Sequence, residues 1–154
     1  MTASDTGATI YASAVLVGSH AVLIRGPSAS GKSRLAFDLI LAGRAGIIAP
    51  TLLIGDDRVH LSVVDGALVV RPAENLAGLL EVRGLGIRGM PFAGRGQVNQ
   101  IVDLDAADAT RLPAPAALEA TLSGVKVPRI AVATGVAALP LVIAALITSA
   151  AKVS

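Results

Sequence analysis

The segment that most constrains the fold of this chain is residues 26–33, which read GPSASGKS. It follows an apolar run, His20–Arg25, that is typical of a strand, and it precedes a run with helical character, Arg34–Ala42. The segment matches the pattern G-x-x-x-x-G-K-[ST] in full. A strand before this pattern and a helix after it are the context in which it forms a phosphate-binding loop. The sequence therefore predicts a P-loop from Gly26 to Ser33.

The residue types of this loop suit the phosphates of a nucleotide. Its glycines let the backbone wrap closely, successive N–H groups point inward, and the following helix adds its positive end. We expect Lys32, solvated when no nucleotide is bound, to reach the β- and γ-phosphates, and the Ser33 hydroxyl to ligate Mg²⁺. The expected ligand is ATP with magnesium, and the predicted cradle comprises Gly26, Pro27, Ser28, Ala29, Ser30, Gly31, Lys32 and Ser33.

The strand before the P-loop is expected to be the second arm of a hairpin, because Gly18-Ser19 is a two-residue turn signal. Gly43 is expected to end the following helix, Asp65-Gly66 to form another hairpin turn, and residues 83–96 to form a glycine-rich loop. A P-loop that follows a hairpin predicts an α/β domain with a mixed sheet rather than a doubly wound nucleotide kinase. The expected strands are Thr9–Val17, His20–Arg25, Ala49–Ile54, Arg58–Val64, Ala67–Arg71, Leu79–Val82, Val98–Leu104 and Val127–Ala133.

Composition narrows the class of protein. The chain is 53% hydrophobic and 16% charged over 154 residues, which predicts one globular domain spanning residues 1–154. Thirteen Lys and Arg against eleven Asp and Glu give a near balance, so we expect no nucleic-acid partner. The chain has no cysteine and no pattern of a signal peptide at its N-terminus. Both observations favour a cytoplasmic protein.

An uncharged stretch near the C-terminus, residues 130–151, is long enough to cross a bilayer. Gly135 and Pro140 divide it, and alanine dominates its composition. We therefore expect a buried strand, a turn and a helix over Leu141–Ala151, and no membrane association.

Charged residues follow two of the predicted strands. Asp56 and Asp57 come directly after Gly55, where a carboxylate would lie beside a metal bound at the P-loop. Since adjacent strand residues point to opposite faces, at most one should face the phosphates unless the strand ends at Gly55. One aspartate is a candidate general base, and the sequence does not distinguish the two. Glu81 and Arg83 have the i, i+2 spacing that puts both on one face of a strand, so both could reach the same phosphate and metal cluster. A surface ion pair between them is the alternative interpretation.

With these residues in view, the chain resembles the catalytic domain of the bacterial HPr kinase/phosphorylase family. The resemblance lies in IYASAVLVGSHAVLIRGPSASGKS, then LLIGDDRV, then LLEVRGLGI, in that order. It implies a P-loop domain of the phosphoenolpyruvate-carboxykinase type, often assembled as hexamers. It also implies transfer of phosphate from ATP to a seryl hydroxyl of the phosphocarrier protein HPr, and a reverse phosphorolysis.

The resemblance also implies roles for single residues. Lys32 corresponds to the phosphate-contacting lysine, Ser33 and Glu81 to magnesium ligands, and the pair Asp56 and Asp57 to the proton acceptor and donor. Arg83 lies in the segment, residues 80–89, that corresponds to the loop used in both reactions. Because almost nothing precedes the catalytic part in this sequence, the resemblance implies one of the short forms of the family.

The chain departs from the family at three places. Tyr11 stands where the family has a histidine, VATGVAALP contains no arginine where the family has an Arg-Asn pair, and extra residues around GRAGIIAPT follow the first helix. The first two departures favour a rival hypothesis, in which the chain is a nucleotide-dependent binding module without phosphotransfer. A small-molecule kinase is a third hypothesis, disfavoured because no lid segment is evident.

Overall fold

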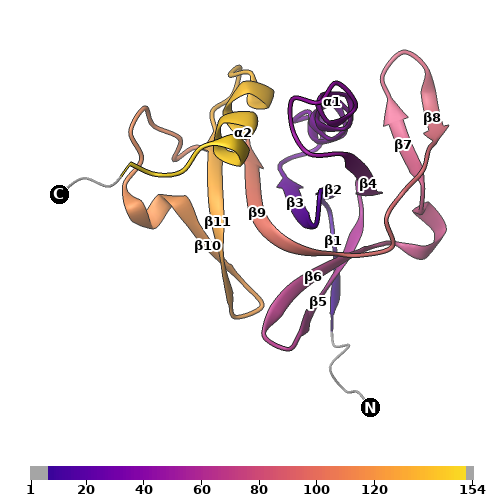
Figure 1. Ribbon diagram of the computed structural model, residues 1–154, viewed down its shortest axis with the longest axis horizontal. Helices are drawn as coiled ribbons and strands as arrows, with labels where there is room; N and C mark the ends of the chain where they lie inside the picture. The colour runs from indigo at the N-terminus through magenta and orange to yellow at the C-terminus, as the bar shows by residue number, and fades with distance from the viewer. Residues whose placement is uncertain (1–6, 152–154) are drawn as a thin grey trace.

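A computed structural model describes residues 7–151, and within that range the chain forms a curled mixed sheet with two helices on one face (Figure 1). The longer sheet has the order β1-β5-β6-β9-β3-β2-β4, with β11 also paired to β9 and β10 to β11. The strands are β1 Ala8–Ile10, β2 Ser13–Val17, β3 His20–Arg25, β4 Thr51–Gly55, β5 Val59–Val64, β6 Ala67–Pro72, β7 Leu79–Val82, β8 Gly86–Gly89, β9 Gly96–Leu104, β10 Glu119–Leu122 and β11 Val125–Val132. The helices are α1 Lys32–Arg44 and α2 Ala138–Ile147, with short 3-10 helices at Glu74–Leu76 and Pro115–Leu118.

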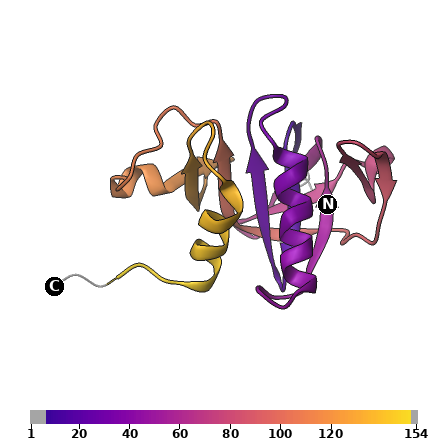
Figure 2. The same ribbon diagram turned by 90° about the horizontal axis from the view of Figure 1, so that it is seen from above.

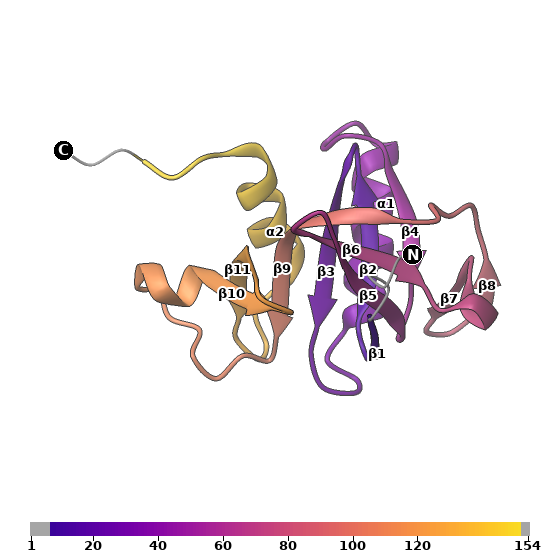
Figure 3. The same ribbon diagram turned by 90° about the horizontal axis from the view of Figure 1, so that it is seen from below.

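The core has two layers, one on each side of the central strands. Alternate residues of β2, β3 and β9 point to opposite faces. Val15, Val22 and Val102 pack with α1 and α2, which lie on the same side of the sheet in the view from above (Figure 2). Leu23 and Ile101 pack instead with β5 and β6, which cross beneath the central strands (Figure 3). The predicted α/β fold with a mixed sheet is thus confirmed.

The central strands place the P-loop at the carboxyl end of a parallel ladder. β9 pairs in parallel with β3 and with β11, and β3 pairs antiparallel with β2 through the turn at Gly18, as predicted. The carboxyl ends of β3, β9 and β11 therefore meet at one edge of the sheet. Ligands bind at such an edge in open α/β sheets.

The predicted first strand, Thr9–Val17, is wrong as a single element. It divides at Tyr11 into β1, which pairs with β5, and β2, which pairs with β3 and β4. The apolar run hides this change of partner, because both halves have the composition of a strand. At the break, the Ala12 N–H donates to the carbonyl oxygen of Asp57 at 3.0 Å.

The first helix does not end at Gly43, as predicted, but continues to Arg44 with Ala45 as its C-cap. Gly43 is buried, and a Cβ at that position would lie 2.7 Å from Oγ1 of Thr51 and 2.8 Å from its backbone nitrogen. Close packing of α1 against β4, rather than a left-handed turn, is therefore what requires glycine here. Gly46, with φ 77°, is the residue with the turn conformation.

The C-terminal third contains a hairpin that the sequence analysis missed. β10 and β11 pair antiparallel around Ser123 and Gly124, whose φ angles are 51° and 80°. The Ser-Gly dipeptide was the available signal. The uncharged stretch, residues 130–151, begins within β11 and includes α2, which runs from Ala138 to Ile147 rather than over Leu141–Ala151 as predicted. Pro140 lies in the first turn of α2, where its missing N–H costs no helical hydrogen bond. No helix in the range 7–151 is long and apolar enough to cross a membrane.

The segment predicted as a glycine-rich loop, residues 83–96, is partly a β-ribbon. β8 pairs antiparallel with β7, and the ribbon projects from the sheet beside β4 (Figure 1). Gly84 and Gly86, with φ angles of 96° and 97°, form the turn.

We expect Gly43→Ala to lower the free energy of unfolding by about 1–3 kcal/mol, because the added methyl group has no room beside β4. The measurement is urea unfolding followed by circular dichroism. Gly94→Ala is the matched control, since no atom lies within 4 Å of a Cβ at Gly94. Equal stabilities of the two variants would contradict the packing role of Gly43.

Candidate functional site

The P-loop has the backbone of an anion nest. Ala29 and Gly31 have positive φ angles of 65° and 101°, and Gly31 is the N-cap of α1. In the described structure no side chain caps this helix end, and its first turn has no acidic residue. The first N–H groups of α1 and its positive dipole are thus available for an anion. A Cβ at Gly31 would meet no atom within 4 Å, so the space above the helix end is open.

Lys32 is not solvated, contrary to the prediction. Its residue is only 8% exposed, and its ammonium group donates hydrogen bonds to the carbonyl oxygens of Gly26 at 2.9 Å and Pro27 at 3.1 Å. The ammonium group therefore folds back onto the first residues of the loop. Two of its three N–H donors are thereby used within the loop.

Ser30 contributes a hydroxyl group that is buried and has no hydrogen-bond partner among residues 7–151. This hydroxyl lies close to Gly26, where a Cβ would come within 2.5 Å of its oxygen. A buried hydroxyl without a partner is costly. Inside a nest of N–H donors it is suited to donate to a phosphate oxygen.

Asp56 is the centre of the site. The strand β4 ends at Gly55, so both aspartates lie beyond it. Asp56 is 6% exposed, and its Oδ1 accepts hydrogen bonds from the hydroxyl groups of Ser33 at 2.6 Å and Ser13 at 2.8 Å. Its Oδ2 accepts the backbone N–H of Glu81 at 3.0 Å. One carboxylate thus joins β2, the start of α1 and β7.

Asp57 has a different environment. It is exposed, and its φ of 66° lies in the left-handed region. The Arg58 N–H donates to the carbonyl oxygen of Asp56 at 2.7 Å, which closes a three-residue turn around Asp57. A turn of this kind with positive φ at its centre is rare and strained. Such strain persists where the surroundings determine the conformation, here through the hydrogen bonds that Ala12 and Ser13 make to the backbone of Asp57.

Glu81 lies on β7, and Arg83 lies in the turn between β7 and β8, so the β-ribbon positions both residues. The backbone of Glu81 contacts Asp56, so β7 lies directly against the P-loop side of the sheet. Both residues are exposed, and Arg83 follows β7 in the turn rather than lying on the strand face. They form no ion pair with each other among the described residues, so the alternative of a surface pair is wrong.

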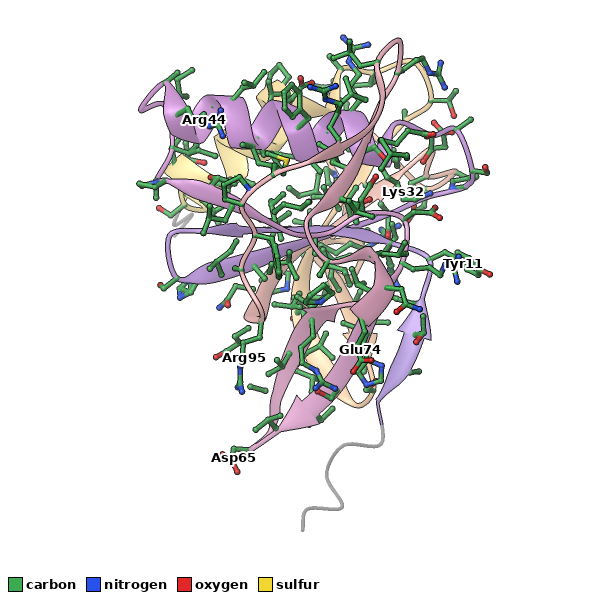
Figure 4. The ribbon with its side chains drawn as sticks, turned by 90° about the vertical axis from the view of Figure 1, so that its right-hand side faces the viewer. Tyr11, Lys32, Arg44, Asp65, Glu74 and Arg95 are labelled. Carbon is green, nitrogen blue, oxygen red and sulfur yellow. The ribbon has the colours of Figure 1, made fainter. Side chains whose placement is uncertain are left out.

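Tyr11 and Arg95, an arginine of the predicted glycine-rich loop, lie on different sides of the molecule. Figure 4 shows Tyr11 projecting on the side where Lys32 lies, at the N-terminal end of α1, with Arg44 at the opposite end. Tyr11 is 73% exposed. Arg95 is well separated from Lys32 in the same view, toward the side of Arg44. Arg88 is exposed on β8.

The sequence analysis missed a charged cluster beside the P-loop. The Arg25 guanidinium donates from Nε to Oδ1 of Asp103 at 2.7 Å and from Nη2 to Oδ2 at 2.8 Å. Arg129 donates from Nε to the same Oδ2 at 2.6 Å, and from Nη1 and Nη2 to Asp108 at 2.8 and 3.0 Å. These residues are far apart in sequence, so only the parallel pairing of β3, β9 and β11 brings them together.

The charges of this cluster are mutually stabilised. Burial raises the pKa of Asp103, but the hydrogen bonds and positive charges of Arg25 and Arg129 outweigh it and hold that pKa below its ordinary value. The hydrogen bond from Arg129 likewise lowers the pKa of Asp108, and hydrogen bonds to Asp108 and Asp103 raise the pKa of Arg129. Asp103, Asp108 and Arg129 therefore stay ionised around neutral pH.

The family model described as HPr Serine kinase C-terminal domain matches residues 6–151. The HPr kinase/phosphorylase of Clostridium beijerinckii is 42% identical over 66 residues, which are 43% of this chain and 20% of that protein. The HPr kinase/phosphorylase of Streptococcus thermophilus is 45% identical over 67 residues, 43% of this chain and 19% of that protein. These alignments span about a fifth of the length of the curated relatives.

A solved structure of the HPr(Ser) kinase/phosphatase from Coxiella burnetii is similar over nearly the whole fold. The two superpose with a TM-score of 0.71 at 25% sequence identity, and the match covers 91% of this chain and 93% of the other.

We expect Asp56→Asn to lower the free energy of unfolding by about 1–3 kcal/mol, because an amide nitrogen would replace one of the two oxygens that accept three buried hydrogen bonds. Asp57→Asn is the matched control and should change it by less than about 0.5 kcal/mol, since the side chain is exposed and asparagine tolerates positive φ. Urea unfolding of both variants is the measurement. A larger loss for Asp57→Asn would contradict the structural role of Asp56.

Proposed function

This chain belongs to the HPr Serine kinase C-terminal domain family, and we propose that it transfers the γ-phosphoryl group of ATP to a seryl hydroxyl of the phosphocarrier protein HPr. The observation that carries the proposal is the pair formed by the P-loop Ser33 and the buried Asp56 at 2.6 Å, beside an uncapped helix end. A hydroxyl and a carboxylate in this relation are the usual protein groups around Mg²⁺ in P-loop enzymes. Acting on HPr, the chain would work in the cytoplasm.

Magnesium fits the residues at this site. Among the described residues no group of three or more His, Cys, Asp or Glu could form a complete metal cage. A magnesium ion bound with a nucleotide needs few protein ligands, because phosphate oxygens and waters fill the remaining positions. Ser33 and Glu81 would hold the ion, with Asp56 orienting the Ser33 hydroxyl. When bound, the ion neutralises charge on the β- and γ-phosphates.

Asp57 is the residue we propose as general base. Asp56 already accepts three hydrogen bonds and is buried, whereas the Asp57 carboxylate is exposed at the end of the same strand. In the step, the seryl oxygen forms a bond to the γ-phosphorus and the bond from that phosphorus to the leaving ADP oxygen breaks. The seryl proton passes to Asp57. Lys32 and Arg83 would stabilise the charge on the transferring group.

Two further expectations belong with this proposal. We propose that residues 1–154 act as one catalytic domain and that copies associate as a homo-oligomer, the hexamer implied by the resemblance. Sedimentation would determine the state. A rival function, nucleotide-dependent binding without phosphotransfer, is favoured by one observation, the exposed Tyr11 in place of the family's histidine.

The proposal is tested by incubating the protein with labelled ATP, Mg²⁺ and purified HPr. The chain should label HPr, and Lys32→Ala should abolish labelling, because the ammonium group acts on phosphate charge. Asp57→Asn should lose roughly 10²–10⁴-fold in rate while it still binds ATP. Arg34→Ala is the control, since its side chain is 85% exposed on the same helix. Nucleotide binding without labelling of HPr would favour the rival function.

We expect the chain to be a better kinase than phosphorylase. Phosphorolysis has to hold inorganic phosphate beside a phosphoseryl group, and arginine is the best donor for that concentration of negative charge. Arg25, at the end of β3, donates to Asp103, and Arg129, on β11, donates to Asp103 and Asp108, so both guanidinium groups are already engaged.

The measurement is a pair of initial rates on one preparation: phosphorylation of HPr with ATP, and dephosphorylation of phosphoseryl-HPr with millimolar phosphate. A phosphorolysis rate equal to or above the kinase rate would show that the departures from the family at Tyr11 and in VATGVAALP do not limit the reverse reaction.

A further inference from the structure

We propose that Asp103 is a positioning residue for nucleotide binding, and that it acts through Arg25 to hold the entry of the P-loop in place. The inference rests on the part of the proposed function that concerns the nucleotide, and it does not depend on the acceptor. It assigns a role to the charged cluster at the carboxyl ends of β3, β9 and β11.

The first step is the position of Arg25. It is the last residue of β3, and Gly26, the first residue of the P-loop, follows it directly. Arg25 lies opposite Asp103 in the parallel ladder of β3 and β9. Its two hydrogen bonds to the two carboxylate oxygens form a fork, which fixes direction as well as distance.

The second step is the tight packing of the loop entry. A Cβ at Gly26 would lie 3.0 Å from the Cβ of Leu104, the residue after Asp103, and 2.5 Å from Oγ of Ser30. The start of the P-loop therefore packs tightly between Leu104, at the end of β9, and Ser30, within the loop itself. A small displacement of β3 against β9 would move Gly26 and, with it, the N–H groups that follow.

The third step concerns what happens when a nucleotide binds. In the described structure the entry has a second support, because Lys32 donates to the carbonyl oxygens of Gly26 and Pro27. That support weakens when the ammonium group also has to serve phosphate oxygens, because two of its three N–H donors go to these carbonyls. The fork between Arg25 and Asp103 then remains to hold the entry, so it matters more with nucleotide bound than without.

The fourth step is the bracing of Asp103 itself. Arg129 donates to its Oδ2, and the side chains of Arg129 and Asp103 are only 13% and 15% exposed. Arg129 also donates to Asp108 and to the carbonyl oxygen of Ala117 at 3.1 Å. Asp103 is thus held from both sides, whereas Asp108 lies at the outer end of the cluster, with its side chain 55% exposed.

The experiment measures the Kd of a fluorescent ATP analogue in the presence of Mg²⁺, at a temperature where every variant is folded by circular dichroism. Arg25→Gln should raise the Kd about tenfold, since misplacement of binding groups by about 1 Å can cost that much or more. Arg25→Lys keeps the charge but not the fork, and it should give an intermediate Kd. Asp103→Asn should resemble Arg25→Gln, and Arg25→Gln serves alone if Asp103→Asn does not fold.

Asp108→Asn is the matched control, because it removes an ion pair of the same cluster at the end away from the P-loop. Its Kd should stay within about twofold of the unchanged protein. A merely structural cluster would change thermal stability in all these variants and leave the Kd of the folded protein unaltered. An unchanged Kd in Arg25→Gln, or an equal rise in Asp108→Asn, would overturn the proposal. Failure to label HPr while the analogue still binds would count against the proposed kinase alone.

Discussion

The carboxylate of Asp56 is the interaction on which the site depends. A charge buried to this degree needs hydrogen-bond donors, and it takes them from β2, α1 and β7. The requirement fixes the separation of the helix start from the strand end, and it draws the β-ribbon against the P-loop. It also fixes the backbone around Asp56, so that the next residue is held exposed in a strained turn. One buried charge therefore accounts both for the assembly of the site and for the different environments of two adjacent aspartates.

The sheet adds a second constraint from the opposite side of the loop. Because β3 pairs with β9 in parallel, the end of β3 has a neighbour that ends at the same edge, and the side chains of Arg25 and Asp103 come face to face. The strand that leads into the P-loop is thus tied to the sheet by an ion pair as well as by the ladder. Asp56 positions the end of the loop, at Ser33, and the cluster around Asp103 lies at its beginning. The two carboxylates have different partners, since Asp56 accepts from two hydroxyl groups and a backbone N–H, whereas Asp103 accepts from Arg25 and Arg129.

Much of this organisation could be predicted from the sequence, and the remainder fails for identifiable reasons. The P-loop, the hairpin before it and the turn at Asp65-Gly66 carry local signals that no distant contact overrides. The division at Tyr11 carries none, because a change of partner leaves composition unaltered. Gly43 was wrongly predicted to end the helix, because glycine is common both after helix ends and where a helix packs closely against a strand. Lys32 was expected in solvent because a sequence does not show that two carbonyl groups of the loop's first turn face the same ammonium group. The arginine cluster depends wholly on strand pairing.

The affinity of the loop for a nucleotide is then a difference between bonds lost and bonds gained. Lys32 already shares its ammonium group between two carbonyl oxygens, and a phosphate would have to compete with them for its three N–H donors. The buried hydroxyl of Ser30 lacks a partner in the described structure and would gain one from a phosphate oxygen. The uncapped N–H groups of α1 would gain partners as well. In the described structure the lysine of the loop is engaged, whereas the Ser30 hydroxyl and the first N–H groups of α1 have no side-chain partner, an arrangement that would favour an anionic group such as phosphate over a neutral ligand.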